Sequence, residues 1–126
     1  MSAEAPPPGT APRATPETTF EDFLRTDIRV GRITAVEPLP GARKPAYKLT
    51  LDFGPEIGVK QSSAQITARY TPGELIGRQI LAVVNFPPRR IAGFKSEVLT
   101  LGVPDETGEV ILIRPGEDAP LGGRLF

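Results

Sequence analysis

The chain contains no cysteine and no histidine among its 126 residues. Disulfides, thiol nucleophiles and Ser-His-Asp triads are therefore excluded, and the usual zinc and haem ligands are missing. Catalysis would be left to carboxylate, lysine, tyrosine or serine side chains. Two acidic pairs, at positions 105–106 and 117–118, lie in turn-like sequence and lack the regular ligand spacing of a calcium loop. We therefore expect no metal and no other cofactor.

Long apolar runs are absent as well, and the first residues do not combine a charged start with an apolar stretch. A membrane span and a secretory signal are therefore not expected. The length is that of one domain. The sequence thus predicts a single domain that resides in the cytoplasm and does not insert into a membrane.

Two combinations of serine and lysine, Lys60 with Ser62 and Lys95 with Ser96, supply the residue types of a Ser-Lys dyad. Side chains that are adjacent on an extended strand point to opposite faces, which disfavours a dyad of this kind. We therefore expect a binding protein and not an enzyme.

Positive charge is concentrated in the middle of the chain although the net charge is zero. Residues 25–95 carry twelve basic and five acidic groups, whereas residues 1–24 and 97–126 are both acidic. A basic centre in a neutral protein indicates a local positive field that attracts phosphates or acidic peptide. The alternative interpretation is a solvated surface without a partner.

Proline dominates the start of the chain. Five prolines fall within residues 1–17, among small and polar residues and with no large apolar side chain after the first methionine. Such a segment cannot bury enough apolar surface to offset the entropy of ordering it, so we expect a disordered tail. The folded domain then spans residues 18–126.

A short helix is predicted at the start of this domain, from Thr19 to about Arg25. Thr18 and Glu21 have the spacing of a capping box, and apolar residues follow at helical spacing. This apolar face would either close one end of a barrel or join a dimer. The candidate dimer residues are Phe20, Phe23 and Leu24 in the helix, and Leu121, Leu125 and Phe126 at the end of the chain.

From residue 27 onward the pattern is that of short β-strands. They are expected over residues 28–36, 47–53, 56–62, 80–84, 98–103 and 110–113. A bulge is expected at Gly31, where the alternation shifts. A short helix is predicted over residues 63–70, followed by a turn or one helical turn with Thr71 as its cap. This order predicts an all-β, five-stranded OB-fold barrel with a short N-terminal helix and a helix between strands 3 and 4. An all-β sandwich is the alternative.

The most informative segment runs from Asn85 to Glu97, NFPPRRIAGFKSE, just after the most apolar stretch. Pro87 and Pro88 cannot donate to a ladder, so the cations that follow are expected on a stiff rim. In an OB barrel this rim, strands 2 and 3 and the flanking loops form one groove for extended nucleic acid. The strand over residues 56–62 is expected to point Lys60 and Ser62 outward, and the cations predicted to converge are Arg43, Lys44, Lys48, Lys60, Arg89, Arg90 and Lys95.

Four strings of sequence carry a family resemblance. They are DIRVGRI (27–33), ARKPAYKLTLDFG (42–54), KQSSAQIT (60–67) and GRQILAVVNFPPRRIAGFKSEVLTLG (77–102). Together they resemble the CsaA proteins, which are bacterial export-related chaperones built on the OB-fold of the tRNA-binding domains attached to some aminoacyl-tRNA synthetases. The resemblance covers about residues 20–126.

The resemblance implies a non-catalytic molecular chaperone that is a homodimer. Each subunit would bind unfolded or presecretory polypeptide in its groove, with the protein-export machinery as a further partner and tRNA as a second ligand. The groove residues that it implies are Ser62, Ser63, Gln65, Asn85, Arg89, Arg90, Phe94 and Ser96.

The alternative function is a tRNA-binding module that acts on tRNA or in complexes with aminoacyl-tRNA synthetases. Dedicated tRNA-binding members of the family resemble this segment but are richer in lysine and have methionines near the places of Ile91 and Val98. This difference favours the chaperone over the tRNA-binding module.

Overall fold

The computed structural model describes residues 11–126. Most of the tail predicted to be disordered, residues 1–10, lies outside the described residues. Residues 11–17 are exposed and carry no helix or strand. No helix in the described part of the chain has the length and apolar character needed to cross a membrane.

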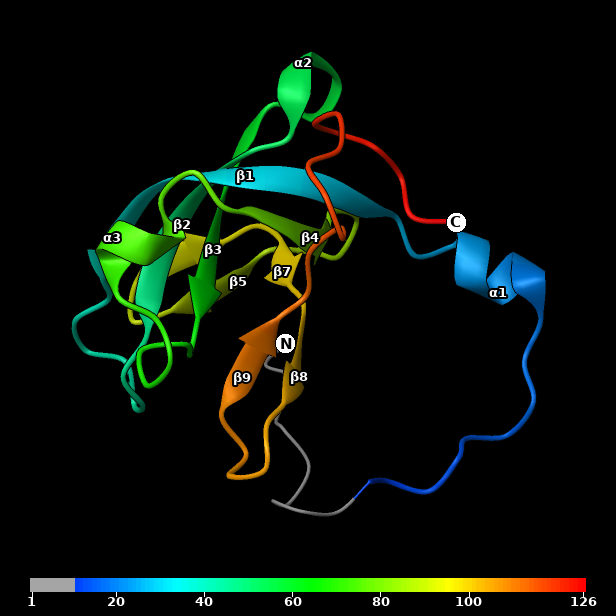
Figure 1. Cartoon of the computed structure of the whole chain (residues 1–126), viewed down its shortest axis with the longest axis horizontal. Helices are drawn as coiled ribbons and strands as arrows, with labels where there is room; N and C mark the ends of the chain where they lie inside the picture. The colour runs from blue at the N-terminus through cyan, green and yellow to red at the C-terminus, as the bar shows by residue number, and fades with distance from the viewer. Residues whose placement is uncertain (1–10) are drawn as a thin grey trace.

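The predicted N-terminal helix is present as α1, Phe20–Leu24. Its cap differs from the prediction, because Thr19 and not Thr18 is the N-cap. The Thr19 hydroxyl accepts a hydrogen bond from the backbone N–H of Asp22 at 3.1 Å. No residue of α1 is buried, and the helix stands away from the barrel (Figure 1).

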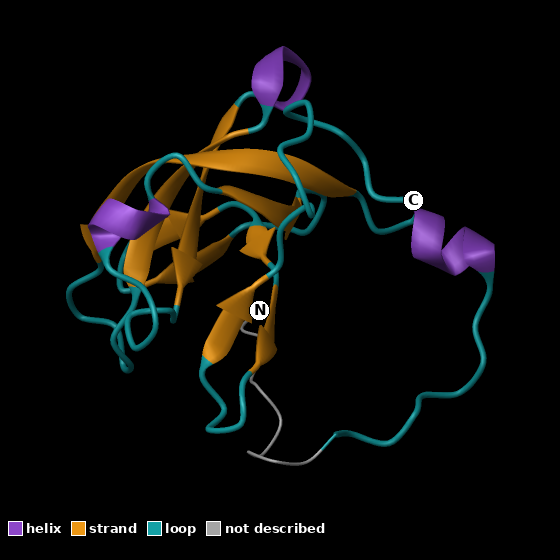
Figure 2. Ribbon diagram, viewed as in Figure 1, coloured by secondary structure: helices purple, strands orange, loops and turns teal. Residues whose placement is uncertain are grey.

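Five antiparallel strands form the main sheet, in the order β3-β2-β1-β4-β7. Their bounds are β1 Ile28–Pro38, β2 Tyr47–Asp52, β3 Val59–Ala64, β4 Gln79–Val83 and β7 Leu99–Thr100. The two end strands meet, and the Thr100 hydroxyl donates a hydrogen bond to the Ser62 hydroxyl at 2.9 Å. The sheet is therefore nearly closed, which confirms the all-β OB-fold (Figure 2).

Two short helices and two hairpins lie outside this five-stranded sheet in the described part of the chain. They are α2 Gly54–Ile57, α3 Pro72–Leu75, a hairpin of β5 Arg89–Ile91 with β6 Phe94–Ser96, and a hairpin of β8 Gly102–Pro104 with β9 Val110–Leu112. Helix α3 lies between the third and fourth strands of the barrel, at the helical turn that was one of the two expectations after residue 70. Its predicted cap is confirmed, because Thr71 and Glu74 form a capping box.

The helix predicted over residues 63–70 does not form. Ser63 and Ala64 instead continue β3, where they pair with Lys48 and Tyr47 of β2. The six-residue partner strand extends this far, so the ladder hydrogen bonds that it offers override the local helical preference of these residues.

The orientation predicted for the strand over residues 56–62 is also wrong. Helix α2 occupies its start, and β3 begins only at Val59, after Gly58 with a φ of +84°. Val59 is 61% exposed, whereas Ser62 is fully buried. Ser62 pairs with Leu49 and Lys60 with Leu51, both fully buried, so Lys60 and Ser62 belong to the inward side of the strand.

The single strand predicted over residues 98–103 is divided at Leu101. The backbone N–H of Leu101 donates to the Leu81 carbonyl, and its own carbonyl accepts from the Ile113 N–H. At this residue the chain leaves β7 and the main sheet and enters the β8–β9 hairpin.

Strand β1 bends through a bulge, but at Thr34 and not at Gly31, because its register with β2 shifts between Ile33 and Ala35. Gly31 has another role. A Cβ at this position would lie 2.7 Å from Cε1 of Phe53, whose ring is fully buried. The glycine therefore makes room for the largest fully buried side chain of the described residues.

Candidate ligand-binding face

The segment expected to be a stiff rim is a two-stranded hairpin, β5–β6, that begins directly after Pro87 and Pro88. Its turn residues Ala92 and Gly93 have φ values of 53° and 79°. Positive φ at both central residues matches the twist of a tight β-hairpin. The prolines therefore lead into regular pairing, and they do not prevent it.

The pairing of the hairpin decides which side chains share a face. Arg89 lies opposite Ser96, and Ile91 lies opposite Phe94. Cross-strand partners point to the same side of a sheet, so these four side chains share one face and Arg90 and Lys95 share the other. The first face of the hairpin therefore carries Arg89, Ile91, Phe94 and Ser96, and the second face carries Arg90 and Lys95.

The hairpin is joined to the edge of β3 through side chains. The Ser63 N–H donates to the Ser96 hydroxyl at 3.0 Å, and the Gln61 N–H donates to Oε1 of Glu97 at 3.1 Å. The Glu97 N–H in turn donates a hydrogen bond to the Gln61 carbonyl at 2.8 Å. Sequence reasoning missed Gln61 and Glu97 as parts of this junction, although Glu97 closes the basic segment and is its only acidic residue.

Strand β2 contributes a cation to the same place. The ammonium of Lys48 lies 5.3 Å from the centre of the Phe94 ring, within the range of a cation–π interaction. This contact brings the first face of the hairpin against the outer side of β2 and β3. We call this region the hairpin corner and define it by Lys48, Ser63, Arg89, Ile91 and Phe94.

The loop between β1 and β2 lies beside the tip of the hairpin. A Cβ built on Gly41 would be 3.6 Å from Cβ of Ala92. Arg43 and Lys44 of this loop are exposed. The loop therefore adds positive charge next to the hairpin corner.

Three other residues predicted for the groove lie outside the hairpin corner. Ser62 is buried, and its hydroxyl donates to the Ser63 carbonyl at 3.0 Å. The Lys60 ammonium lies 3.9 Å from Oε2 of Glu97. Gln65 is exposed and follows the end of β3. Ser62 is thus enclosed between β3 and β7, and Lys60 lies beside Glu97, just after the hairpin.

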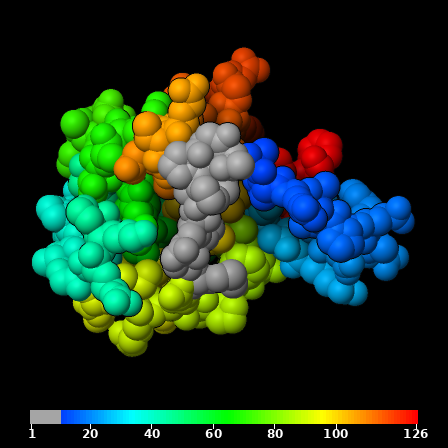
Figure 3. Space-filling view, turned by 90° about the horizontal axis from the view of Figure 1, so that it is seen from below, coloured from blue at the N-terminus to red at the C-terminus, as the bar shows by residue number. Residues whose placement is uncertain are grey.

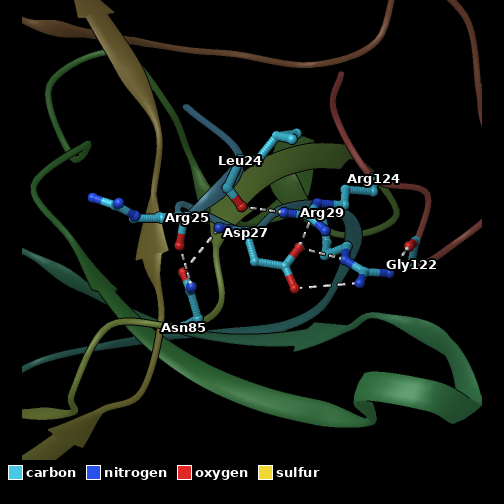
Figure 4. A network of polar contacts seen from close by, with 7 residues as sticks. All are labelled: Leu24, Arg25, Asp27, Arg29, Asn85, Gly122 and Arg124. Atoms are coloured by element: carbon cyan, nitrogen blue, oxygen red, sulfur yellow. Dashed lines mark hydrogen bonds and ion pairs between the residues drawn. The ribbon is translucent and has the colours of Figure 1, made fainter. Parts of the chain in front are cut away.

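Asn85 belongs to a polar network at the base of α1, shown in Figure 4. Its amide accepts a hydrogen bond from the Asp27 N–H at 2.9 Å and donates one to the Arg25 carbonyl at 2.7 Å. Both functional atoms of the amide are thus engaged within the chain. Asn85 fixes the segment between α1 and β1.

The same network ties the two ends of the domain together. The Asp27 carboxylate lies 2.6 Å from Nε of Arg29 and 3.4 Å from Nε of Arg124. The hydrogen bonds that Arg29 donates to the Asp27 carboxylate raise the pKa of Arg29. Arg124 also donates to the Leu24 carbonyl at 2.6 Å.

The predicted dimer residues divide into two groups. Four are exposed: Phe20 by 69%, Leu24 by 41%, Leu125 by 39% and Phe126 completely. Figure 1 shows the end of the chain beside α1. Phe23 and Leu121 are half-buried. The backbone of Leu121 packs against Gly54, since a Cβ added at Gly54 would lie 3.1 Å from the Leu121 carbonyl oxygen.

The acidic residue Asp105 is occupied by its own turn. Its carboxylate lies 2.6 Å from Nη1 of Arg69 and accepts hydrogen bonds from Thr107 and from the Glu109 N–H. The bond from the Thr107 hydroxyl, with those from Arg69 and the backbone, lowers the pKa of Asp105 to about 2. This carboxylate is therefore committed to holding the β8–β9 hairpin to the turn after β3.

Comparison with known proteins places this geometry in a defined group. Residues 28–124 match the model of the putative tRNA binding domain. The chain is 55% identical to the crystal structure of the chaperone CsaA from Bacillus anthracis, with a TM-score of 0.82 over 88% of this chain and 100% of that one. The CsaA chaperone protein from Picrophilus torridus is 50% identical, with a TM-score of 0.81 over 87% and 100%.

A longer relative contains a similar segment. The methionine–tRNA ligase of Porphyromonas gingivalis is 35% identical over 106 residues, which are 84% of this chain. The match spans 15% of the length of that ligase. The similarity therefore concerns one segment of the ligase.

Proposed function

The chain belongs to the tRNA-binding domain family and groups there with the CsaA chaperones, and on this premise we propose that it is a non-catalytic chaperone of the CsaA type. It binds unfolded polypeptide in extended form at the hairpin corner. Delivery of presecretory polypeptide to the export machinery is part of this proposal.

One observation carries the proposal. Strand β6 faces β3, whereas the outer edge of β5 has no strand partner among the described residues. An extended polypeptide can add to such an edge through main-chain hydrogen bonds, which do not depend on its sequence. Ile91 and Phe94 lie on the hairpin face that meets β2 and β3, and both stay partly exposed, so they can supply apolar contact for its side chains.

The state of Phe94 favours polypeptide over bases. A face of its ring is covered by the Lys48 ammonium at 5.3 Å. Stacking of bases on aromatic rings is the main sequence-tolerant contact of single-stranded nucleic acid, and it needs an accessible ring face. The Lys48 contact removes part of that area while the ring edge still offers apolar surface.

Binding of tRNA is the second candidate function. It is favoured by the family and by the positive charge of Arg43 and Lys44 beside the corner. Contacts of this type engage phosphates and make affinity fall steeply with salt. Apolar and main-chain contacts to a polypeptide depend on salt much less.

A direct test titrates a labelled, permanently unfolded polypeptide and tRNA against the protein at two salt concentrations. We expect polypeptide affinity to change little with salt and tRNA to compete only at low salt. A polypeptide affinity as salt-sensitive as that of tRNA would contradict the chaperone proposal.

The two adjacent arginines provide a matched pair of variants. Arg89 lies on the corner face of the hairpin and Arg90 on the opposite face. Arg89→Ala should weaken polypeptide binding several-fold, whereas Arg90→Ala should leave it nearly unchanged. Equal effects of the two variants would show that general positive charge, and not the corner, binds the ligand.

We further propose that the protein is a homodimer through α1 and the end of the chain. Four exposed apolar side chains lie on these two segments, and contiguous exposed apolar surface marks interaction sites. The double variant Phe20→Asp with Leu125→Asp should be monomeric in analytical ultracentrifugation. Sedimentation of the wild-type protein as a monomer at micromolar concentration would contradict the proposed homodimer.

A further inference from the structure

Lys48 lies where strand β2 meets the β5–β6 hairpin. Its cross-strand neighbour on β3 is Ser63, whose backbone N–H donates to the Ser96 hydroxyl at 3.0 Å. This bond holds the hairpin beside β2, and the Lys48 ammonium lies 5.3 Å from the centre of the Phe94 ring. The position of this lysine over the ring therefore follows from the way in which the hairpin is joined to the barrel.

The ammonium of Lys48 has no acidic partner within residues 11–126. The ion pairs of these residues all involve other cations. Glu37, which lies opposite Lys48 in the β1–β2 ladder, is exposed and forms no ion pair with it. Lys48 and Phe94 are both half-buried. The aromatic ring is thus the group that attracts this ammonium.

Positive charge near this ring would draw nucleic acid to the hairpin corner. Arg43 and Lys44 of the β1–β2 loop are exposed, and Figure 3 shows that loop, in cyan, next to the hairpin, in yellow-green. Such cations attract phosphates whatever the bases are. Unpaired bases gain further affinity by stacking on an open ring face, and Phe94 is the aromatic residue of the corner. Access to the Phe94 ring therefore decides how well bases bind there.

Given the function proposed for the hairpin corner, on which this step rests, we propose that Lys48 is a specificity-determining residue that selects polypeptide over unpaired bases. A base that stacks on the covered face must displace the ammonium and lose the cation–π contact, which weakens its binding about two- to fivefold. An extended polypeptide leaves the contact in place, because its apolar side chains can pack on Ile91, on the ring edge and on the aliphatic stem of Lys48.

Two uncharged variants separate the covering of the ring from the charge of the lysine. Lys48→Met and Lys48→Thr both remove the positive charge, so they lose the same attraction for phosphates. Methionine still reaches the ring and makes a favourable sulfur–aromatic contact. Threonine is too short to reach it and is well suited to a strand. A difference between these variants therefore reports the covering of the ring alone.

The test measures binding of the full chain to a labelled single-stranded oligoadenylate by fluorescence anisotropy at fixed salt. We expect Lys48→Thr to bind this strand about two- to fivefold more tightly than Lys48→Met does. An abasic strand of the same length should bind equally to both variants. In a Phe94→Leu background the difference should vanish, because no ring remains for a base to stack on.

Equal affinities of the two variants for the oligoadenylate, at melting temperatures close to that of the wild type, would overturn this role of Lys48. A gain that also occurs on the abasic strand, or that persists with Phe94→Leu, would overturn it as well, because stacking would not be its cause. Lys48→Val is a second short and uncharged variant for the same comparison if Lys48→Thr lowers the melting temperature.

The same proteins are titrated with the labelled unfolded polypeptide. Lys48→Thr should bind it no more tightly than Lys48→Met, and a gain equal to that for the oligoadenylate would contradict selection between the two ligands. Absence of polypeptide binding to the wild type would contradict the function proposed for the corner. The comparison on the oligoadenylate would still show whether Lys48 restricts access to the ring, so the two failures are distinguishable.

Discussion

The hydroxyl of Ser96 accepts a hydrogen bond from the backbone N–H of Ser63 at 3.0 Å, so a side chain takes the place of a ladder carbonyl between the hairpin and β3. Glu97 does the same for the Gln61 N–H at 3.1 Å. The serines and the glutamate of this junction thus hold the hairpin at the angle that forms the corner.

Replacement of Ser96 by alanine should therefore destabilise the protein. The Ser63 N–H is part-buried and would lose its acceptor, which costs about 1–2 kcal/mol. Urea unfolding followed by circular dichroism measures this change. The control is Lys95→Ala, which removes an exposed neighbour and should change stability by less than about 0.5 kcal/mol. Equal stabilities of the two variants would show that the junction does not depend on this bond.

Gly31 should not tolerate a side chain. In Gly31→Ala the added Cβ would lie 2.7 Å from Cε1 of Phe53, in a fully buried part of the core. Overpacking of this kind costs about 1–3 kcal/mol. Gly116→Ala is the matched control, because a Cβ there meets nothing within 4 Å. Thermal unfolding compares both variants with the wild type, and a Gly31→Ala protein as stable as Gly116→Ala would contradict the close packing.

Ala92 should be replaceable by glycine with a gain in stability. It is the one non-glycine residue with positive φ in the described part of the chain, at 53°. Glycine adopts this conformation without the steric cost of a Cβ, so Ala92→Gly should stabilise the protein by about 0.5–1 kcal/mol. Ala68→Gly, in an exposed turn without positive φ, should not stabilise it. Chemical unfolding curves of the two variants decide the point, and a loss of stability in Ala92→Gly would contradict it.

The stabilising effect of Asp105 should depend on pH. Its pKa is lowered to about 2 in the folded protein from 3.8, chiefly by the Thr107 hydroxyl. A lowered folded-state pKa stabilises the fold above the unfolded pKa, and the effect is lost as pH falls through the folded value. The melting temperature of Asp105→Asn should therefore lie below that of the wild type at pH 6, and the difference should shrink between pH 4 and pH 2.

Glu106→Gln is the control for that experiment, since it changes a neighbouring carboxylate for which no contact to Arg69 is present. Its melting temperature should follow that of the wild type across the same pH range. A constant difference between Asp105→Asn and the wild type down to pH 2 would show that the charge of Asp105 is not the cause.

Strand prediction succeeded where one strand carries its own complete pattern. Leu49, Leu51 and Phe53 alternate with polar residues and are all fully buried, and the cap at Thr71 follows from its spacing to Glu74. It failed for Ser62, because helix α2 shifts where β3 begins and so reverses which side chains point inward. Register depends on the partner strand, and a shift of one residue exchanges the two faces.

The candidate site, like the strands, was predicted from the sequence only in part. The segment from Asn85 to Glu97 was singled out by its composition, and its basic residues do lie on one hairpin next to the β1–β2 loop. Sequence alone did not distinguish Arg89 from Arg90, or Ser96 from Lys95, since only the hairpin register places them on opposite faces. Ser62 and Asn85 were predicted as ligand contacts, whereas the structure engages their polar atoms within the chain.

The sequence by itself determined the class of fold, the exclusion of thiol and histidine chemistry, and the family, because alternation, composition and ordered strings of residues are local properties of the chain. Only the tertiary structure decided which polar groups are occupied and which remain available to a ligand. A hydrogen bond such as that between Ser63 and Ser96 joins residues 33 positions apart. Its formation depends on how the barrel closes, and local sequence does not encode that closure.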